Sequence, residues 1–177
     1  MNPIATPDVY GELTEPLTLR IQRLLPGPVD RVWAYLTEGE LRRQWLAAGD
    51  MTLQVGAPFE FVWRNDELAD EPAQRPEGFP EEQRMQSRIT EVDAPRLLSF
   101  NWHGSGDVTF ELEEQGDGVL LTVTHRRLPA RKTLVGVAAG WHVHLDILGG
   151  RLVGSRIEPF WVGWRRVREE YESRLPT

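Results

Sequence analysis

Apolar residues recur at helical spacing between positions 134 and 152, and this stripe organises the prediction of the fold. Its members are Leu134, Val137, Ala138, Trp141, Leu145, Leu148 and Leu152. They share one face of a helix with 3.6 residues per turn. At about 100° per residue, His144 falls on one border of the stripe, and His142 and Asp146 fall on the other. The pattern predicts a long helix that covers a curved sheet, with a ligand cavity between them.

Alternating apolar and polar positions predict the strands of that sheet. The first strand is expected over residues 17–24. Six further segments have strand character: 51–55, 58–63, 83–92, 97–103, 107–113 and 118–125. Short turns rich in Gly, Pro and Asp separate the last four segments, so neighbouring strands should pair in an antiparallel meander. We therefore expect an α+β fold with a sheet of six to seven antiparallel strands.

Helical spacing and capping residues predict the other helices. Two short helices should follow the first strand, the earlier one beginning near Pro28 and the later one held by a capping box between Thr37 and Glu40. Gly154 is a plausible end for the long helix, and a terminal helix is expected over residues 158–174. Residues 1–16 are predicted to form an extended arm, and residues 17–177 a single domain. The acidic, proline-rich segment 65–82 should be a mobile, solvated loop that could gate the cavity.

Composition narrows the class of protein. The chain has 177 residues, a formal net charge of −7 and no cysteine. The charge argues against a nucleic acid or an anionic membrane as partner, and the absence of cysteine and of any visible leader favours a cytoplasmic protein. Seven tryptophans are many for this length, and large aromatic side chains fill cores or line pockets for flat ligands.

Four blocks of sequence carry a resemblance to a known family. They read RLLPGPVDRVWAYLTEGELRRQWLA over 23–47, ITEVDAPRLLSFNW over 89–102, LLTVTHRRLP over 120–129 and GWHVHLDIL over 140–148. In these blocks the chain resembles the family named after the activator of the heat-shock-protein-90 ATPase, within the START-like superfamily. The resemblance implies a helix-grip fold, in which an antiparallel sheet wraps around a long carboxy-terminal helix. It implies no fixed chemistry, because relatives include co-chaperone domains, lipid and hormone carriers, and cyclases.

The polar borders of the long helix supply the candidate chemistry. His142 and Asp146 are one turn apart, so the carboxylate could orient the imidazole as an acid–base pair, or the two could simply face water. His144 and His142 are two residues apart and diverge, and no cysteine supplements them, so no metal is expected. Arg88 lies within a strand-like segment, where it either points to solvent or is buried against Asp146 or a ligand carboxylate.

Aromatic residues indicate where a flat ligand would bind. Phe100 and Trp102 share one face of the strand 97–103, with His103 on the other face. Trp63 from a neighbouring strand, together with Trp141 and Leu145 from the helix, could join them around one space. The alternative is that these side chains are only core.

We therefore expect non-catalytic binding of a small hydrophobic or aromatic molecule, without a cofactor, by a monomer or homodimer. Two rival functions stay open. One is a cyclase- or hydrolase-like enzyme with His142 as base and Asp146 as its orienting partner. The other is a stress-related co-chaperone that offers a surface to a chaperone partner. A roomy pocket with His142 and Asp146 converging on it would favour the enzyme, and a well-packed interior would favour the co-chaperone.

Overall fold

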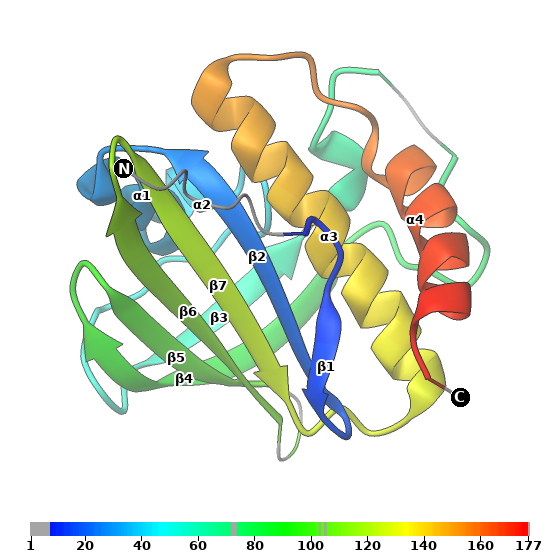
Figure 1. Ribbon diagram of the computed structural model, residues 1–177, viewed down its shortest axis with the longest axis horizontal. Coiled ribbons are helices and arrows are strands. Elements are labelled where there is room, and N and C mark those ends of the chain that lie inside the picture. The colour runs from blue at the N-terminus through cyan, green and yellow to red at the C-terminus, as the bar shows by residue number, and fades with distance from the viewer. Residues whose placement is uncertain (1–7, 72–73, 103, 105, 177) are drawn as a thin grey trace.

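The computed structural model describes residues 8–71, 74–102, 104 and 106–176. Its strands form one antiparallel seven-stranded sheet in the order β1-β2-β7-β6-β5-β4-β3 (Figure 1). The strands are β1 (Glu12–Glu15), β2 (Thr18–Pro26), β3 (Pro58–Trp63), β4 (Gln83–Asp93), β5 (Leu97–Trp102), β6 (Gly106–Gln115) and β7 (Gly118–Arg126). Strands β3 to β7 pair in chain order and β2 closes on β7, which confirms the expected meander and α+β class.

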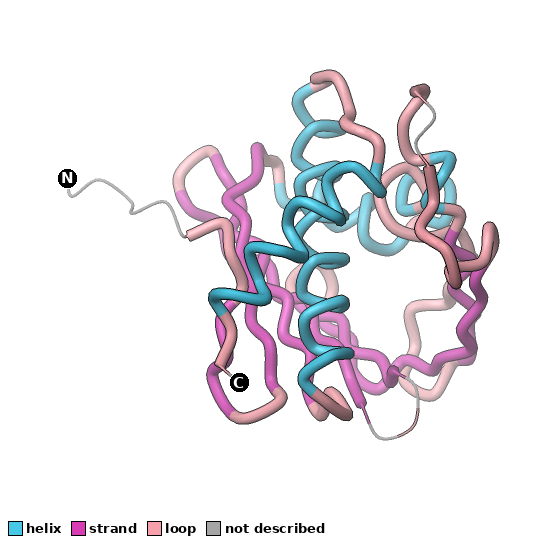
Figure 2. The backbone as a smooth tube through the Cα atoms, turned by 90° about the vertical axis from the view of Figure 1, so that its right-hand side faces the viewer, coloured by secondary structure: helices cyan, strands magenta, loops and turns pink. Residues whose placement is uncertain are grey.

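Helices cover one face of this sheet. They are α1 (Val29–Thr37), α2 (Gly39–Arg42), the 3-10 turn η1 (Asn65–Glu67), α3 (Arg131–Val153) and α4 (Phe160–Arg174). Figure 2 shows α4 packed beside α3, and of the two helices α3 is the one that contacts the sheet. The long helix ends as predicted at Gly154, whose φ of 72° is the left-handed conformation that glycine adopts without strain.

The inner face of the sheet packs against the apolar stripe of α3. The ring of Trp141 lies 5.8 Å from Phe110 on β6 and 5.9 Å from Trp102 on β5. Its Nε1 donates a hydrogen bond of 3.1 Å to Nδ1 of His125 on β7. Leu145, one turn later, is completely buried. These contacts confirm that the stripe faces the sheet.

The residues around α3 also bury the two histidines on its polar borders, although Asp146 stays exposed, and this differs from the expected half-exposed helix. His142 and His144 retain only 5% and 6% of their surface exposed. The reason is that α4 packs along the side of α3 away from the sheet, so that side does not face water. An amphipathic pattern predicts one buried face, and a second packed helix can bury the remainder.

Two local predictions are wrong, and a third concerns the amino-terminal arm. Residues 51–55 form no strand, and the apolar side chains of Leu53 and Val55 there are exposed. The capping box does not form, because the Thr37 hydroxyl donates to the Trp33 carbonyl 2.9 Å away, within α1. The expected arm ends in strand β1, which pairs with β2, while its residues 1–7 lie outside the described residues.

None of the helices in the described part of the chain has both the length and the apolar character needed to cross a membrane.

Leu145→Asp should prevent folding, because an unpaired charge would be buried where the side chain is completely enclosed. We expect the free energy of unfolding to fall by several kcal/mol, about 4 or more. Val153→Asp on the same helix is the control, because Val153 is 65% exposed, and it should cost less than about 1 kcal/mol. Thermal unfolding followed by circular dichroism measures both, and equal melting temperatures for the two variants would contradict the placement of Leu145.

Candidate functional site

A pocket of about 290 Å³ lies between the inner face of the sheet, α3, α4 and the loop after β3. Its lining residues are Leu46, Trp63, Asn65, Phe79, Gln83, Trp102, Thr133, Val137, Gly140, Trp141, His144, Phe160, Trp161 and Trp164. The volume is close to the lower end of the range for small-molecule sites, about 300 Å³. It is also roughly twice the 150 Å³ of a cavity known to hold one benzene ring, so it suits a bicyclic molecule.

The walls of this pocket are mainly aromatic. Five of the seven tryptophans in the chain line it. On the sheet side, Trp63 and Trp102 meet edge to face with ring centroids 5.5 Å apart, and Trp102 lies 5.9 Å from Trp141. On the opposite side, Trp161 and Trp164 of α4 lie 5.6 Å apart. The surplus of tryptophan noted in the sequence is therefore concentrated around one space.

The loop between β3 and β4 forms the outer wall. Its Phe79 ring lies 5.0 Å from Trp161 and 5.2 Å from Trp164. Nε1 of Trp161 donates a 2.7 Å hydrogen bond to Asp66, and Arg75 forms an ion pair with the same carboxylate. The loop was expected to be solvated, but these contacts attach it to α4. Its mobility and gating role stay predictions.

One face of α3 forms the inner wall, with Thr133, Val137, Gly140, Trp141 and His144 within about 100° of one another. A Cβ atom placed on Gly140 would meet no other side chain or backbone within 4 Å, so this glycine borders open space. Glycine inside a helix is less stable than alanine by about 1 kcal/mol. The helix therefore carries a destabilising residue at the point where it borders the pocket.

His144 contributes a polar group to this wall. Its Nδ1 lies 2.7 Å from the carbonyl oxygen of Trp45, and its ring centroid lies 4.6 Å from that of Phe160. Burial lowers the pKa of His144 to about 4, so the imidazole is neutral at pH 7. Because a carbonyl only accepts hydrogen bonds, Nδ1 must carry the proton and Nε2 is left as an acceptor.

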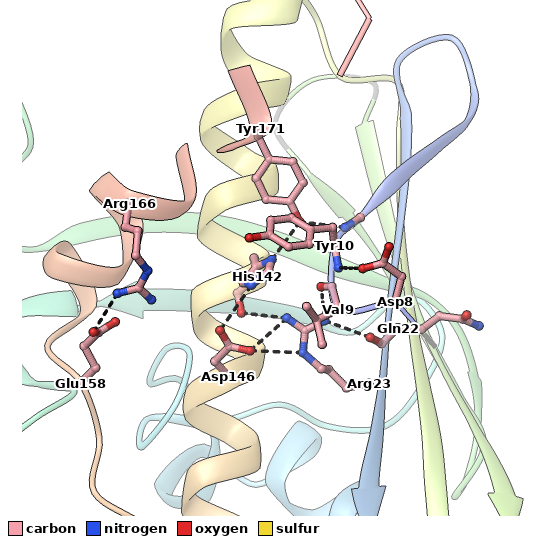
Figure 3. A network of polar contacts seen from close by, with 11 residues as sticks. Asp8, Val9, Tyr10, Gln22, Arg23, His142, Asp146, Glu158, Arg166 and Tyr171 are labelled. Carbon is pink, nitrogen blue, oxygen red and sulfur yellow. Dashed lines mark hydrogen bonds and ion pairs between the residues drawn. The ribbon is translucent and has the colours of Figure 1, made fainter. Parts of the chain in front are cut away.

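The opposite border of α3 carries a separate polar network (Figure 3). Arg23 of β2 is 7% exposed and donates to Asp146 Oδ1 at 3.0 Å and to the His142 carbonyl at 3.3 Å. Nε2 of His142 lies 3.4 Å from the second carboxylate oxygen of Asp146. Arg23 also donates to the Val9 carbonyl, so the network holds the amino-terminal segment against the helix.

Tyr171 completes this network from α4. Its hydroxyl accepts a 2.7 Å hydrogen bond from the Gly11 amide and lies 3.0 Å from Nδ1 of His142. Burial lowers the pKa of His142 to about 4, although Asp146 opposes the shift, and burial raises the pKa of Tyr171 to about 12. Both groups are therefore neutral at pH 7. The hydroxyl then donates to Nδ1, and Nε2–H points to Asp146, so every donor in this chain of contacts has an acceptor.

The two borders of α3 therefore do not meet in one site, contrary to the expectation that His142 and Asp146 face the same cavity as Trp102. At about 100° per residue, positions 142 and 146 leave the helix roughly opposite His144 and Gly140. Neither side chain lines the pocket. His142 is enclosed instead by the rings of Tyr10 and Tyr171, with centroids 4.8 and 5.7 Å away.

Other predicted site residues separate in the same way. The structure brings Trp63, Trp102, Trp141 and His144 together around the pocket. Phe100 and Leu145 are completely buried in the core and do not line it. Arg88 is exposed and donates to the Gly56 carbonyl, so the partner of Asp146 is Arg23 rather than Arg88. His103 lies outside the described residues.

Several residues of the pocket and of the polar network are not among those predicted from the sequence. Arg23 carried a signal, because it falls on the apolar face of β2 together with Leu19 and Ile21, where a buried charge needs a partner. Phe79 and Trp161 carried no such signal in the sequence, because their place in the pocket wall depends on how the loop and α4 pack together. Among the described residues, no group of three or more His, Asp or Glu side chains is placed to hold a metal ion.

Acid should destabilise the fold through two of its buried histidines, His142 and His144. Both have a folded pKa of about 4 against an ordinary value of 6.5, so the unfolded chain binds more protons between these values. The stabilisation linked to the two neutral histidines is therefore fully present above about pH 6.5, and it decreases as the pH drops towards 4. We expect each of these histidines to lower the free energy of unfolding by about 2–3 kcal/mol between pH 7 and pH 4.5.

Urea unfolding of the wild type and of His142→Asn, followed by tryptophan fluorescence at several pH values, measures this effect. The variant should lose stability less steeply with falling pH, because the contribution of His142 is gone. A pH dependence identical to that of the wild type would show that His142 is not buried in its neutral form.

Known proteins share both the sequence pattern and the fold of this chain. A search of the curated proteins finds no match. Among solved structures, the protein encoded by gene BPP1335 of Bordetella parapertussis is similar, with 35% identity, a TM-score of 0.80 and coverage of 100% of this chain and 96% of the other. CalU16 of Micromonospora echinospora has 23% identity, a TM-score of 0.66 and coverage of 88% and 86%.

A third solved structure is DynU16, described as belonging to the dynemicin biosynthetic locus. It has 20% identity and a TM-score of 0.62, and the match covers 81% of this chain and 49% of the other. At such identities, CalU16 and DynU16 support the helix-grip fold. The family model for Activator of Hsp90 ATPase homolog 1-like protein matches residues 26–152, which is more than half of the chain. The chain therefore belongs to the Activator of Hsp90 ATPase homolog 1-like protein family.

Proposed function

We propose that this protein binds a small, planar, hydrophobic molecule in the aromatic pocket and does not transform it. The observation that carries the proposal is the wall of five tryptophans around a space of about 290 Å³, into which Gly140 opens. Proteins rarely leave such a volume next to large apolar side chains, because interiors are otherwise close-packed. We propose that the protein acts in the cytoplasm, in keeping with the absence of cysteine.

Binding would be driven by burial of the ligand surface. Removing apolar surface from water contributes about 25 cal/mol per Å², and each aromatic pair adds about 0.5–1.5 kcal/mol when the rings are offset or edge to face. Trp102 and Trp161 come from opposite walls of the pocket, so a flat ligand would meet rings on both of its sides. A micromolar dissociation constant, which corresponds to about 8 kcal/mol, is within reach of a bicyclic ligand.

The geometry gives little support to the acid–base enzyme. His142 and Asp146 lie away from the pocket, and the donors and acceptors of the network are already used by Arg23 and Tyr171. A histidine whose pKa is held at about 4 is also a weak base at neutral pH, where a catalytic base works best with a pKa near the operating pH. The family implies a chaperone partner as the other alternative, but the pocket favours a ligand.

Filling the pocket should abolish binding without harming the fold. In Gly140→Leu the new side chain would enter open space, and replacing a helical glycine should also stabilise α3 by about 0.5–1 kcal/mol. We expect isothermal titration calorimetry to give micromolar binding of 2-naphthol or indole to the wild type. The variant should bind at least tenfold more weakly, while its melting temperature is unchanged or higher.

Gly136→Leu is the matched control, because a Cβ there also meets nothing within 4 Å but Gly136 does not line the pocket. It should bind like the wild type. Trp102→Ala should weaken binding several-fold, because one aromatic contact is worth about 0.5–1.5 kcal/mol. The absence of wild-type binding below about 100 µM, or unchanged binding in Gly140→Leu, would refute the proposal.

A further inference from the structure

The hydrogen-bonding groups of the pocket indicate which class of planar molecule it selects. His144 is the first of these groups. Its Nδ1 proton is committed to the Trp45 carbonyl, which leaves Nε2 as an acceptor. No described residue donates to Nε2, and this atom is not among those buried without a partner, so it is open to a ligand.

Asn65 provides the second group. Its Oδ1 is buried and has no hydrogen-bond partner among the described residues, although the side chain lines the same pocket. A buried acceptor without a donor costs free energy, and such groups in native proteins are usually paired with protein or with ordered water. Because Asn65 Oδ1 is enclosed by protein atoms, Nε2 of His144 is the acceptor that is open to a ligand.

The pocket also lacks cations. None of its lining residues within the described chain is Lys or Arg. Three of its indole N–H groups are already used: Trp141 donates to His125, Trp161 to Asp66 and Trp164 to the Gly136 carbonyl. A ligand carboxylate would therefore be buried beside acceptors and without a counter-charge, which strongly disfavours binding.

We infer that the pocket selects neutral planar aromatic molecules that carry a hydroxyl or N–H donor, with the donor bound to Nε2 of His144. This inference rests on the proposed function and adds the chemical class of the ligand. Acceptor-only aromatics of the same shape bind more weakly, because they leave Nε2 of His144 unpaired. Aromatic acids are excluded by their charge.

Three ligands of similar shape test the inference: 2-naphthol carries a donor, 2-methoxynaphthalene carries only an acceptor, and 2-naphthoate is an anion at pH 7. Isothermal titration calorimetry on the full chain should show that 2-naphthol binds at least tenfold more tightly than 2-methoxynaphthalene, with 2-naphthoate weakest. In His144→Asn the short amide can still donate to the Trp45 carbonyl, but its acceptor oxygen does not reach the position of Nε2. The affinity for 2-naphthol should then fall to that for 2-methoxynaphthalene, which should itself be unchanged.

His142→Asn is the matched control, because it replaces the buried histidine on the opposite border of α3, and it should keep the preference for 2-naphthol. If His144→Asn does not fold, nitrogen-15 spectra of the wild-type imidazoles decide the question. The Nε2 resonance of His144 should shift with 2-naphthol and not with 2-methoxynaphthalene. Equal affinities for these two ligands, or a preference that survives in His144→Asn, would overturn this inference and leave the proposed function intact. If no ligand binds, the proposed function itself fails.

Discussion

The structure depends on the enclosure of α3. The sheet covers one side of this helix and α4 another, so His142 and His144 are buried along with its apolar stripe. A buried polar group is tolerated only when it is hydrogen-bonded, and the surrounding elements supply the partners. Tyr171 and Arg23 approach one border and the Trp45 carbonyl the other. These contacts fix the position of α3 against three other parts of the chain.

Local sequence patterns predict most of this architecture, because the strands, the turns between them and the end of the long helix depend on residues that are close together in the chain. Period-two alternation and short turns locate β4 to β7, and Gly154 marks the end of α3. The same reasoning fails over residues 51–55, where apolar residues lie at the surface, and at Thr37, whose hydroxyl bonds back to its own helix. In both places the local preference is weak, and other contacts override it.

The candidate site was predictable only in part. Helical geometry placed Trp141 on the stripe and put His142 and His144 on opposite borders, and the pocket indeed uses one border. Which border faces a cavity depends on where α4 and the loop pack, and no local pattern carries that information. Asp146 needed a cation, yet the choice between Arg23 and Arg88 required the strand register, which places Arg88 opposite Pro58 near the exposed edge.

The division between the two borders of α3 also has an evolutionary consequence. The side that holds the amino-terminal segment through Arg23 and Tyr171 uses interlocking polar contacts, where most substitutions break several bonds at once. The aromatic side relies mainly on ring packing, and its described lining residues include no Asp, Glu, Lys or Arg. Exchanges between large and small apolar residues there would reshape the cavity while the rigid side maintains the fold. With the function proposed above, such a protein can drift from one ligand to another through single substitutions, without passing through unfolded intermediates.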